Sequence, residues 1–259
     1  MSSRATHPEL LEQRIAENRA SQEIDLPTWI FERLAVRSED HVLELCCGTG
    51  GQTLRILELL GESGSILGLD VSGEALQTLA SRVGGQHQGK LRLVEGSLDN
   101  LSEALEKSSG FDLIFCAYGL YYSSNAALTL NQARGWLKPG GRIAIVGPFG
   151  PNNKPLFDLV RQSGVSLPDP VVYSSERFML ETVLPWGALN FESVSINTMV
   201  NRVRWTALEK VMNYWHSTTF YEPGRRTEFE RLLRQHFHTH TEFVNEKWVM
   251  MLEMTHARA

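Results

Sequence analysis

Hydrophobic positions between residues 41 and 148 form short apolar runs, separated by longer stretches in which apolar residues recur at helical spacing. The apolar runs predict strands at 42–45, 65–69, 91–94, 113–116 and 142–146. The stretches between them predict helices at 52–60, 73–83, 98–107 and 125–137. The strands show little alternation of apolar and polar residues, as expected when helices cover both faces of a sheet. This strand–helix alternation predicts an α/β fold with a doubly wound, Rossmann-like and mostly parallel sheet.

The segments on either side of this region have a different pattern. Residues 10–20 and 26–31 predict two helices, and Pro27 suits the first turn of the second. After Pro148, a proline-punctuated region with short helices leads into a strand at 189–203, helices at 205–217 and 225–237, and a strand at 243–254. We predict an N-terminal helical cap at 1–40 and one domain at 41–259, with 151–240 as an insertion on the ligand side.

The composition is that of an ordinary globular protein, because 42% of the 259 residues are hydrophobic and 21% are charged. The net charge of −5 argues against non-specific nucleic-acid binding. The first residues lack the apolar core of a signal peptide, and no apolar run approaches the roughly 18 residues of a membrane span. Cys46, Cys47 and Cys116 have no spacing typical of disulfides or zinc sites. We therefore expect a cytoplasmic protein with no membrane partner.

Residues 41–51 combine a strand, a tight turn and a helix N-terminus. An apolar run that contains Glu44 is followed by small residues, among them Gly48 and Gly50. These two glycines let a ligand approach the backbone closely. A dinucleotide fingerprint, G-x-G-x-x-G, would need a third glycine at position 53, where Thr53 stands. The turn therefore departs from the dinucleotide fingerprint, and the glycines alone leave its ligand open.

Residues 44–50 resemble the first motif of the class I S-adenosylmethionine-dependent methyltransferases, with Cys46 in place of the first glycine. Residues 67–72 resemble the second motif, and Asp70 follows Gly48 by 22 positions, near the ~20 expected for a ribose-binding acid. Segments 94–98, 111–117 and 137–142 resemble the later motifs in the order that the family has them. The resemblance implies a seven-stranded sheet with an antiparallel last strand, N-terminal helices and a C-terminal lid or insertion.

The resemblance also implies S-adenosyl-L-methionine as cofactor and S-adenosyl-L-homocysteine as product. The residues implied in cofactor binding are Glu44, Cys46, Gly48, Gly50, Asp70, Val71, Ser97, Leu98 and Cys116. Asp70 would accept from the ribose hydroxyls, Val71 would pack on the adenine, and Glu44 would lie near the ammonium. The alternatives are that Glu44 is a structural acid and that Asp70 caps the following helix. Because strand four of the family lies beside strand one, we expect Cys116 near Cys46 or Cys47.

The function that this resemblance implies is in-line methyl transfer to the oxygen or nitrogen of a small molecule, as in the similar ubiquinone- and menaquinone-biosynthesis group. Candidate bases for a hydroxyl acceptor are His216, Tyr121 and Tyr122, although His216 could equally be a packing residue. We expect a small-molecule partner and no nucleic-acid partner. Two other interpretations stay open: a non-catalytic adenosylmethionine-binding protein or partner subunit, and, disfavoured by Thr53, a nicotinamide-dependent reductase.

His236, His238 and His240 alternate near the end of a predicted helix and invite comparison with a metal site. No Asp or Cys pattern surrounds them, whereas metal sites draw their ligands from such clusters. We therefore expect a polar helix-to-strand junction and no metal.

Overall fold

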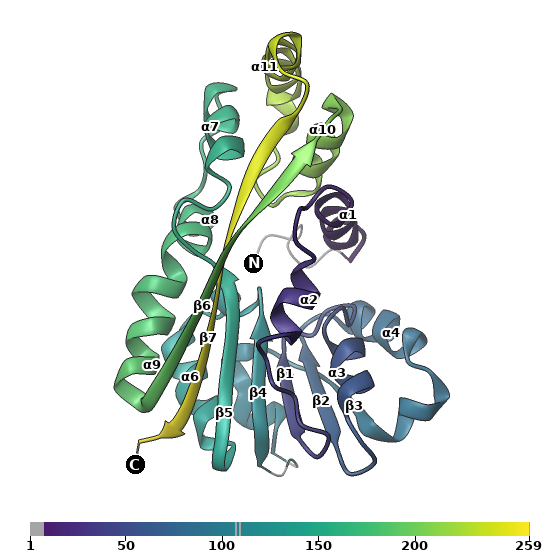
Figure 1. The fold of residues 1–259 in the computed structure, drawn as a ribbon, viewed down its shortest axis with the longest axis vertical. Coiled ribbons are helices and arrows are strands. Elements are labelled where there is room, and N and C mark those ends of the chain that lie inside the picture. The colour runs from purple at the N-terminus through teal and green to yellow at the C-terminus, as the bar shows by residue number, and fades with distance from the viewer. Residues whose placement is uncertain (1–7, 107, 109, 259) are drawn as a thin grey trace. The chain divides into compact units, whose positions relative to one another are not determined.

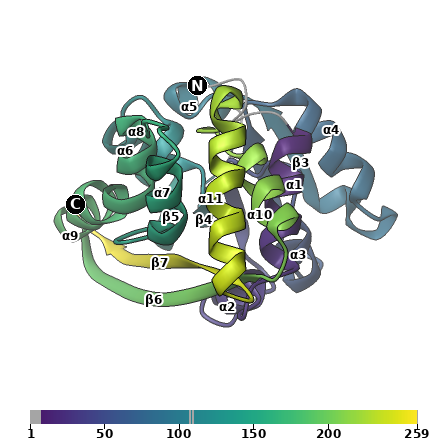
Figure 2. The ribbon, with the colours of Figure 1, turned by 90° about the horizontal axis from the view of Figure 1, so that it is seen from above.

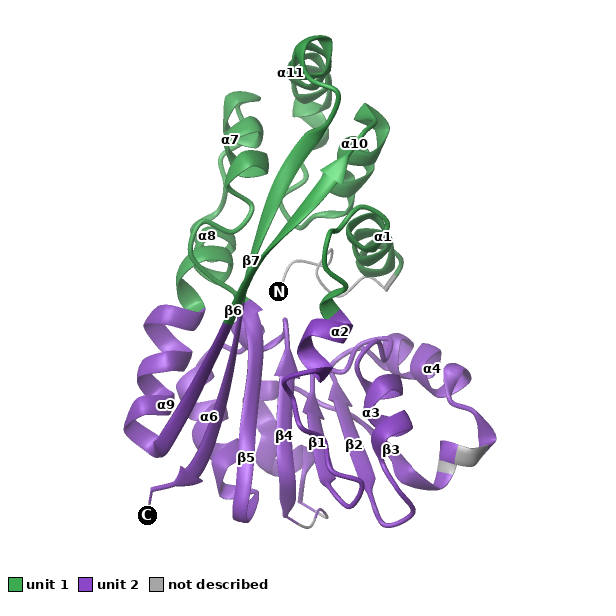
Figure 3. Ribbon diagram, viewed as in Figure 1, with its two compact units in different colours: residues 1–26, 148–178, 198–249 green, residues 27–147, 179–197, 250–259 purple. Residues whose placement is uncertain are grey.

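The computed structural model describes residues 8–106, 108 and 110–258. The chain divides into two compact units (Figure 3). Unit 1 comprises residues 1–26, 148–178 and 198–249, and unit 2 comprises residues 27–147, 179–197 and 250–259. The predicted boundary at residue 40 and the predicted insertion at 151–240 are not tested by this division, and they remain proposals.

Seven strands form one sheet in the order β3-β2-β1-β4-β5-β7-β6 (Figure 1). The strands are β1 (His41–Leu45), β2 (Ser65–Asp70), β3 (Leu91–Glu95), β4 (Phe111–Ala117), β5 (Leu137–Pro148), β6 (Phe191–Trp205) and β7 (Phe243–Ala257). Strands β1 to β5 pair in parallel, and the last strand, β7, runs in the opposite direction. The predicted Rossmann-like α/β fold with a mostly parallel seven-stranded sheet is confirmed.

Helices follow β1 to β4 near the predicted positions, although the helix predicted at 98–107 is a 3-10 turn (Leu98–Asn100) followed by the short helix α5 (Leu101–Ala104). The helices are α1 (Pro8–Arg19), α2 (Leu26–Phe31), α3 (Thr53–Leu59), α4 (Gly73–Arg82), α5 (Leu101–Ala104), α6 (Ala126–Gly135), α7 (Lys154–Gln162), α8 (Asp169–Val172), α9 (Leu184–Asn190), α10 (Leu208–Ser217) and α11 (Arg226–Thr239). In unit 2, α3 packs on β2, and α4 packs on β2 and β3. Within the described residues, no helix combines the length and apolar character needed to cross a bilayer.

A buried ion pair holds the amino-terminal edge of the sheet in unit 2. Asp40, just before β1, lies 2.8 Å from a guanidinium nitrogen of Arg142 in β5, and their side chains are 2% and 5% exposed. The guanidinium also lies 3.4 Å from Glu253 in β7 and donates to the backbone oxygen of Ala35. These bonds satisfy charges that would be costly to bury alone. They join the segment before β1 to β5 and β7, at the edge of the sheet where β1 begins and the antiparallel β7 ends.

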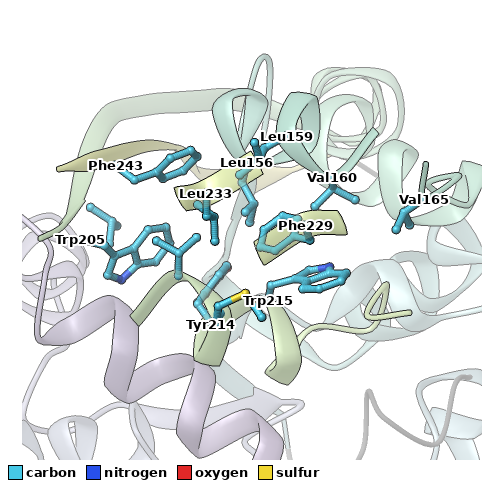
Figure 4. Packing of buried hydrophobic residues seen from close by; sticks show 13 residues of the cluster. Leu156, Leu159, Val160, Val165, Trp205, Tyr214, Trp215, Phe229, Leu233 and Phe243 are labelled. Atoms are coloured by element: carbon cyan, nitrogen blue, oxygen red, sulfur yellow. The ribbon is translucent and has the colours of Figure 1, made fainter. Parts of the chain in front are cut away.

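Unit 1 has a hydrophobic core of its own (Figure 4). It includes Trp205, Tyr214, Trp215, Phe229 and Phe243. Trp215 stacks on Phe229 with ring centroids 4.1 Å apart, and Tyr214 lies 4.9 Å from Trp205. Helix α10 packs against both α1 and α11, and α11 packs against α7 (Figure 2). These late aromatic residues therefore hold unit 1 together.

The N-terminal segment of unit 1 covers part of β6. Gln22 forms an antiparallel bridge with Val203, and the amide of Asn201 donates to the oxygen of Ile24 at 2.7 Å. In this part of β6 the buried residues are Met199, Asn201, Val203 and Trp205. The sequence groups Val194, Ile196, Thr198 and Val200 on one face, and this is the less buried face of the strand. The edge pairing explains the burial of a polar residue such as Asn201.

The proline-rich region is more helical than its sequence suggests. Helix α8 continues through two wide π-helical segments, at Tyr173–Arg177 and Met179–Val183, into α9. Pro185 stands at the start of α9, where the π-helical segment gives way to the α-helix. Several prolines of this region stand at helix starts, and for this reason the sequence predicted fewer helical residues than the structure contains.

Candidate cofactor-binding site

The turn after β1 has an unusual backbone. Cys46, Gly48 and Gly50 have φ values of 58°, 54° and 91°, in the left-handed region that favours glycine. A β-carbon on Gly50 would also run into the side chain of Leu79 in α4, whereas one on Gly51 would meet nothing within 4 Å. Gly50 is therefore needed both for its conformation and for the close approach of α4.

Asp70, at the end of β2, binds this turn directly. Its Oδ2 accepts a 2.8 Å hydrogen bond from the backbone N–H of Gly48, and its Oδ1 accepts a 2.9 Å bond from that of Ser72. The residue that caps α4 is Ser72, whose hydroxyl accepts from the N–H of Ala75. A carboxylate has about four acceptor positions, so each oxygen of Asp70 keeps one for a ligand hydroxyl. The arrangement fits a ribose-binding acid better than a helix cap.

Glu44 is a buried acid with one protein partner in the described structure. Its side chain is 2% exposed, and its Oε2 accepts a 2.6 Å hydrogen bond from Oγ1 of Thr53, which is fully buried at the start of α3. Burial raises the pKa of Glu44 to about 8, the bond from Thr53 lowers it, and the charge of Asp70 raises it. In the sequence, Thr53 stands out only because it occupies the position of the third glycine of a dinucleotide fingerprint. In the structure it is the donor that supports the ionised form of Glu44.

The cysteines lie together as expected, since Leu45 pairs with Cys116 between β1 and β4. A hydrogen bond between the thiols of Cys46 and Cys116, together with burial, raises the pKa of Cys46 well above its usual range. A β-carbon on Gly119 would lie 2.6 Å from Sγ of Cys46 and 3.5 Å from Sγ of Cys116. Gly119 therefore makes room for a cysteine where the family most often has glycine. No motif in the sequence signalled this role of Gly119.

Val71, Ser97 and Leu98 lie after β2 and β3, beyond the strand ends. Val71 is 47% exposed, so its side chain is accessible for packing against a ring. The hydroxyl of Ser97 accepts from the N–H of Asp99, so it is partly used in capping. Leu98 is 5% exposed, and its backbone oxygen accepts a 3.1 Å bond from Thr129. The geometry leaves the adenine-facing roles of these three residues as predictions.

The loops after β3 and β4 are joined by Asp99, which the sequence analysis did not single out. Its carboxylate accepts from the hydroxyl of Ser123 at 2.8 Å and from the N–H of Ser124 at 2.9 Å. Burial opposes ionisation, but these hydrogen bonds outweigh it and lower the pKa of Asp99. The ionised carboxylate of Asp99 thus joins two loops that border the expected cofactor site.

The three candidate bases do not lie in one unit. Tyr121 and Tyr122 follow β4 in unit 2, with ring centroids 4.8 Å apart in an edge-on contact. His216 lies in the last turn of α10 in unit 1, with its ring 4.8 Å from that of Tyr221. All three are partly exposed. Their catalytic roles stay predictions.

The late histidines form a junction between α11 and β7. The rings of His236 and His240 stack with centroids 4.4 Å apart and planes 6° apart, and Nε2 of His236 lies 2.9 Å from the oxygen of Glu242. Parallel rings do not direct their nitrogens at one point, as metal coordination requires. In the described part of the chain, no three His, Cys, Asp or Glu side chains are grouped so that they could hold a metal ion.

Comparison with known protein families places this site in context. Residues 42–141 match the family described as "Methyltransferase domain". This segment belongs to the class I S-adenosylmethionine-dependent methyltransferases. The methyltransferase segment contains every residue implied in cofactor binding, from Glu44 to Cys116. S-adenosyl-L-methionine is the cofactor of this family, in agreement with the expectation from the sequence.

Curated relatives match the same part of the chain. The chain is 31% identical over 124 residues to a demethylmenaquinone methyltransferase of Lactobacillus johnsonii, covering 48% of this chain and 50% of that protein. It is 32% identical over 116 residues to a 2-phytyl-1,4-naphtoquinone methyltransferase of Trichormus variabilis, covering 44% and 49%. The chain thus spans about half the length of the curated relatives it matches.

Solved structures are similar in fold to this chain beyond the methyltransferase segment as well. The YcgJ protein of Bacillus subtilis aligns with a TM-score of 0.61 at 14% identity, covering 90% of this chain and 98% of that one. A putative methyltransferase of Bacillus halodurans aligns with a TM-score of 0.60 at 11% identity, covering 89% and 98%. At these identities the likeness shows the fold alone.

The residues present fit the family's cofactor. The turn offers backbone free of side chains at Gly48 and Gly50, Asp70 has acceptor positions left for hydroxyls, and Glu44 is a buried acid suited to a cationic group. Thr53 and Gly119 complete the arrangement from outside the quoted motifs.

Proposed function

We propose that the chain transfers a methyl group from S-adenosyl-L-methionine to a small-molecule acceptor, at oxygen or nitrogen, by in-line displacement. The observation that supports this most is the hydrogen bond from the N–H of Gly48 to Asp70, which joins the first two motifs in one turn. S-adenosylmethionine supplies a methyl group already activated by a sulfonium centre. The protein's task is then to bind, orient and exclude water.

Each residue of the turn has a distinct part in this proposal. The remaining acceptor positions of Asp70 bind the ribose hydroxyls, and the exposed side of Val71 covers the adenine. Glu44 balances the positive charge of the methionine part when ionised, and Thr53 favours that ionised form. The fixed left-handed turn from Cys46 to Gly50 reduces the ordering cost of binding.

The acceptor side is drawn from elsewhere in the chain. We propose that the N-terminal helices and residues 151–240 determine which acceptor binds, and that Tyr121, Tyr122 or His216 accepts a proton where the acceptor is a hydroxyl. Quinone-related aromatic compounds are the first to screen, because the relatives named above are named for acceptors of that kind. An amine that binds neutral would need no base.

Two experiments test the proposal. Calorimetry with S-adenosylmethionine, S-adenosylhomocysteine and NADH should show binding of the first two and none of the third, and the reverse result would support a reductase. A screen of quinols, phenols and amines with S-adenosylhomocysteine release as readout then tests turnover. Tight binding of S-adenosylmethionine without product from any class would instead favour a non-catalytic binding protein.

A further inference from the structure

Unit 1 contains a polar network centred on Lys247 of β7. Its Nζ donates hydrogen bonds to Oη of Tyr214 in α10 and to Oδ1 of Asn153, which precedes α7, both at 2.5 Å. The same nitrogen lies 4.4 Å from the centroid of the Tyr214 ring. An ammonium held by several partners has few other positions, so the network fixes a positive charge at one place.

The chain holds Lys247 there at a conformational cost. Asn153 has a φ of 63°, and its backbone N–H donates to the oxygen of Glu246 at 2.8 Å. Its Oδ1 also accepts a 2.9 Å hydrogen bond from Asn245, which is 0% exposed. Oδ1 of Asn245 in turn accepts from the N–H of Leu156 at 3.4 Å. Strained backbone that its surroundings hold in place is concentrated at functional positions.

Arg14 of α1 brings a second positive charge to Tyr214. Its guanidinium donates to the backbone oxygen of Ser217, which follows Tyr214 by three residues on α10. Burial opposes ionisation of Tyr214, but the charges of Lys247 and Arg14, with hydrogen bonds from Lys247 and Asn18, outweigh it and lower the pKa of the phenol. Two cations from distant parts of the chain therefore act on one oxygen.

Lys247 and Arg14 carry the positive charge of this network. Within the residues that the structure describes, the hydrogen bonds of Lys247 and Arg14 go to neutral groups. Glu246, beside Lys247 in sequence, lies 3.7 Å from Arg202 instead. Oδ1 of Asn18 is buried and, in the same described part, has no hydrogen-bond partner. An ammonium has three donors and a guanidinium five, so both cations keep unused donors.

We propose that Lys247, Arg14 and Tyr214 form a binding site for an oxyanion of a small molecule. Lys247 and Arg14 are both half-buried, so their attraction for an anion is screened less than at an open surface. The oxyanion that this site suits is an ionised carboxyl or an ionised acidic hydroxyl. The oxyanion site itself does not depend on methyl transfer.

The test uses the full chain and three probes of similar shape. Benzoate carries a carboxylate, 4-nitrophenolate carries an ionised hydroxyl, and benzamide is neutral. Calorimetry should show that benzoate or 4-nitrophenolate binds, and the stronger of the two identifies the kind of oxyanion. Lys247→Met and Arg14→Gln should each weaken that binding about tenfold, the effect of losing one modest charge–charge contact. Benzamide should bind no differently to these variants.

Two controls separate charge from folding. Lys247→Arg keeps the charge and should retain most of the binding, with a thermal unfolding curve recorded for every variant. Lys154→Met removes an exposed lysine of the same unit, which pairs with Asp158 at 2.5 Å, and should leave binding unchanged. Failure of both anions to bind the wild-type chain, or equal binding by Lys247→Met, overturns the proposal.

Binding of S-adenosylmethionine to the same variants is measured separately. Its dissociation constant should be unchanged in Lys247→Met, because the residues proposed to hold it lie in unit 2. A wild-type chain that binds benzoate but not S-adenosylmethionine would refute the proposed function and leave the oxyanion site standing. The opposite pattern would refute the oxyanion site alone.

Discussion

Replacing Thr53 by valine tests what sets the protonation state of Glu44. The hydroxyl of Thr53 donates a 2.6 Å hydrogen bond to Glu44, and the two residues are 0% and 2% exposed. Burial raises the pKa of Glu44 to about 8 against the opposing effect of this bond. Valine keeps the branched shape of threonine and removes the donor. The ionised form of Glu44 then loses the hydrogen bond that supports it.

The size of the effect follows from the kind of bond. A hydrogen bond to a charged group contributes about 1.5–3 kcal/mol, and about 1.4 kcal/mol corresponds to one pH unit. Thr53→Val should therefore raise the pKa of Glu44 by a further ~1–2 pH units. If the cationic cofactor binds only when Glu44 is ionised, its apparent affinity falls about tenfold for each pH unit below the pKa of Glu44. The reason is that the ionised fraction of Glu44 falls in the same ratio.

Calorimetric titration with S-adenosylmethionine from about pH 6 to pH 10 measures this directly. Wild-type affinity should rise with pH and level off near 8, the pKa of Glu44. Thr53→Val should level off ~1–2 pH units higher and bind about tenfold more weakly at pH 8. Thr53→Ser restores the hydroxyl and should follow the wild-type curve. A Thr53→Val curve that coincides with wild type, or a Thr53→Ser curve that coincides with Thr53→Val, would refute the reasoning.

Three further changes test the stability of unit 2. The pKa of Glu44 in the folded protein is about 8, above its ordinary 4.5. The cofactor-free protein should therefore lose up to about 5 kcal/mol of unfolding free energy as the pH rises from 4.5 to about 8. In urea unfolding, Glu44→Gln should remove this loss. Gly50→Ala should destabilise the folded protein by about 2–4 kcal/mol, because position 50 has a φ of 91° and an added β-carbon would clash with Leu79. Gly51→Ala, the control, should be near neutral, and thermal unfolding measures both. Arg142→Met should lower the free energy of unfolding by about 3–5 kcal/mol, because it leaves Asp40 buried without its partner. The control, Arg55→Met, removes a 54% exposed arginine and should lower it by under about 1 kcal/mol.

Each of these has a contrary outcome. Unchanged pH dependence in Glu44→Gln would mean that another group titrates in that window. Equal unfolding midpoints for Gly50→Ala and Gly51→Ala would show that α4 can move away from the turn. An Arg142→Met variant as stable as wild type would show that Asp40 is neutralised or solvated when its partner is removed.

The sequence predicted the cofactor half of the site because its signals are local. An apolar run, a glycine turn and an acid at the next strand end specify a strand–turn–helix unit whatever the rest of the chain does. Asp70 and Gly48 meet because neighbouring parallel strands bring their carboxyl ends to the same edge. The placement of Cys116 beside Cys46 followed from the same strand order and is confirmed.

By itself, the sequence determined the α/β fold and the glycine turn, because periodicity and spacing carry that information. The expected cofactor came from the resemblance of its motifs to a known family. Only the tertiary structure decided which groups partner one another across long separations. Thr53, at the start of α3, donates to Glu44 of β1, and Gly119 matters because it faces Cys46. Arg14, Tyr214 and Lys247 meet from three distant segments. No local pattern records such a meeting, because it depends on how separate elements pack.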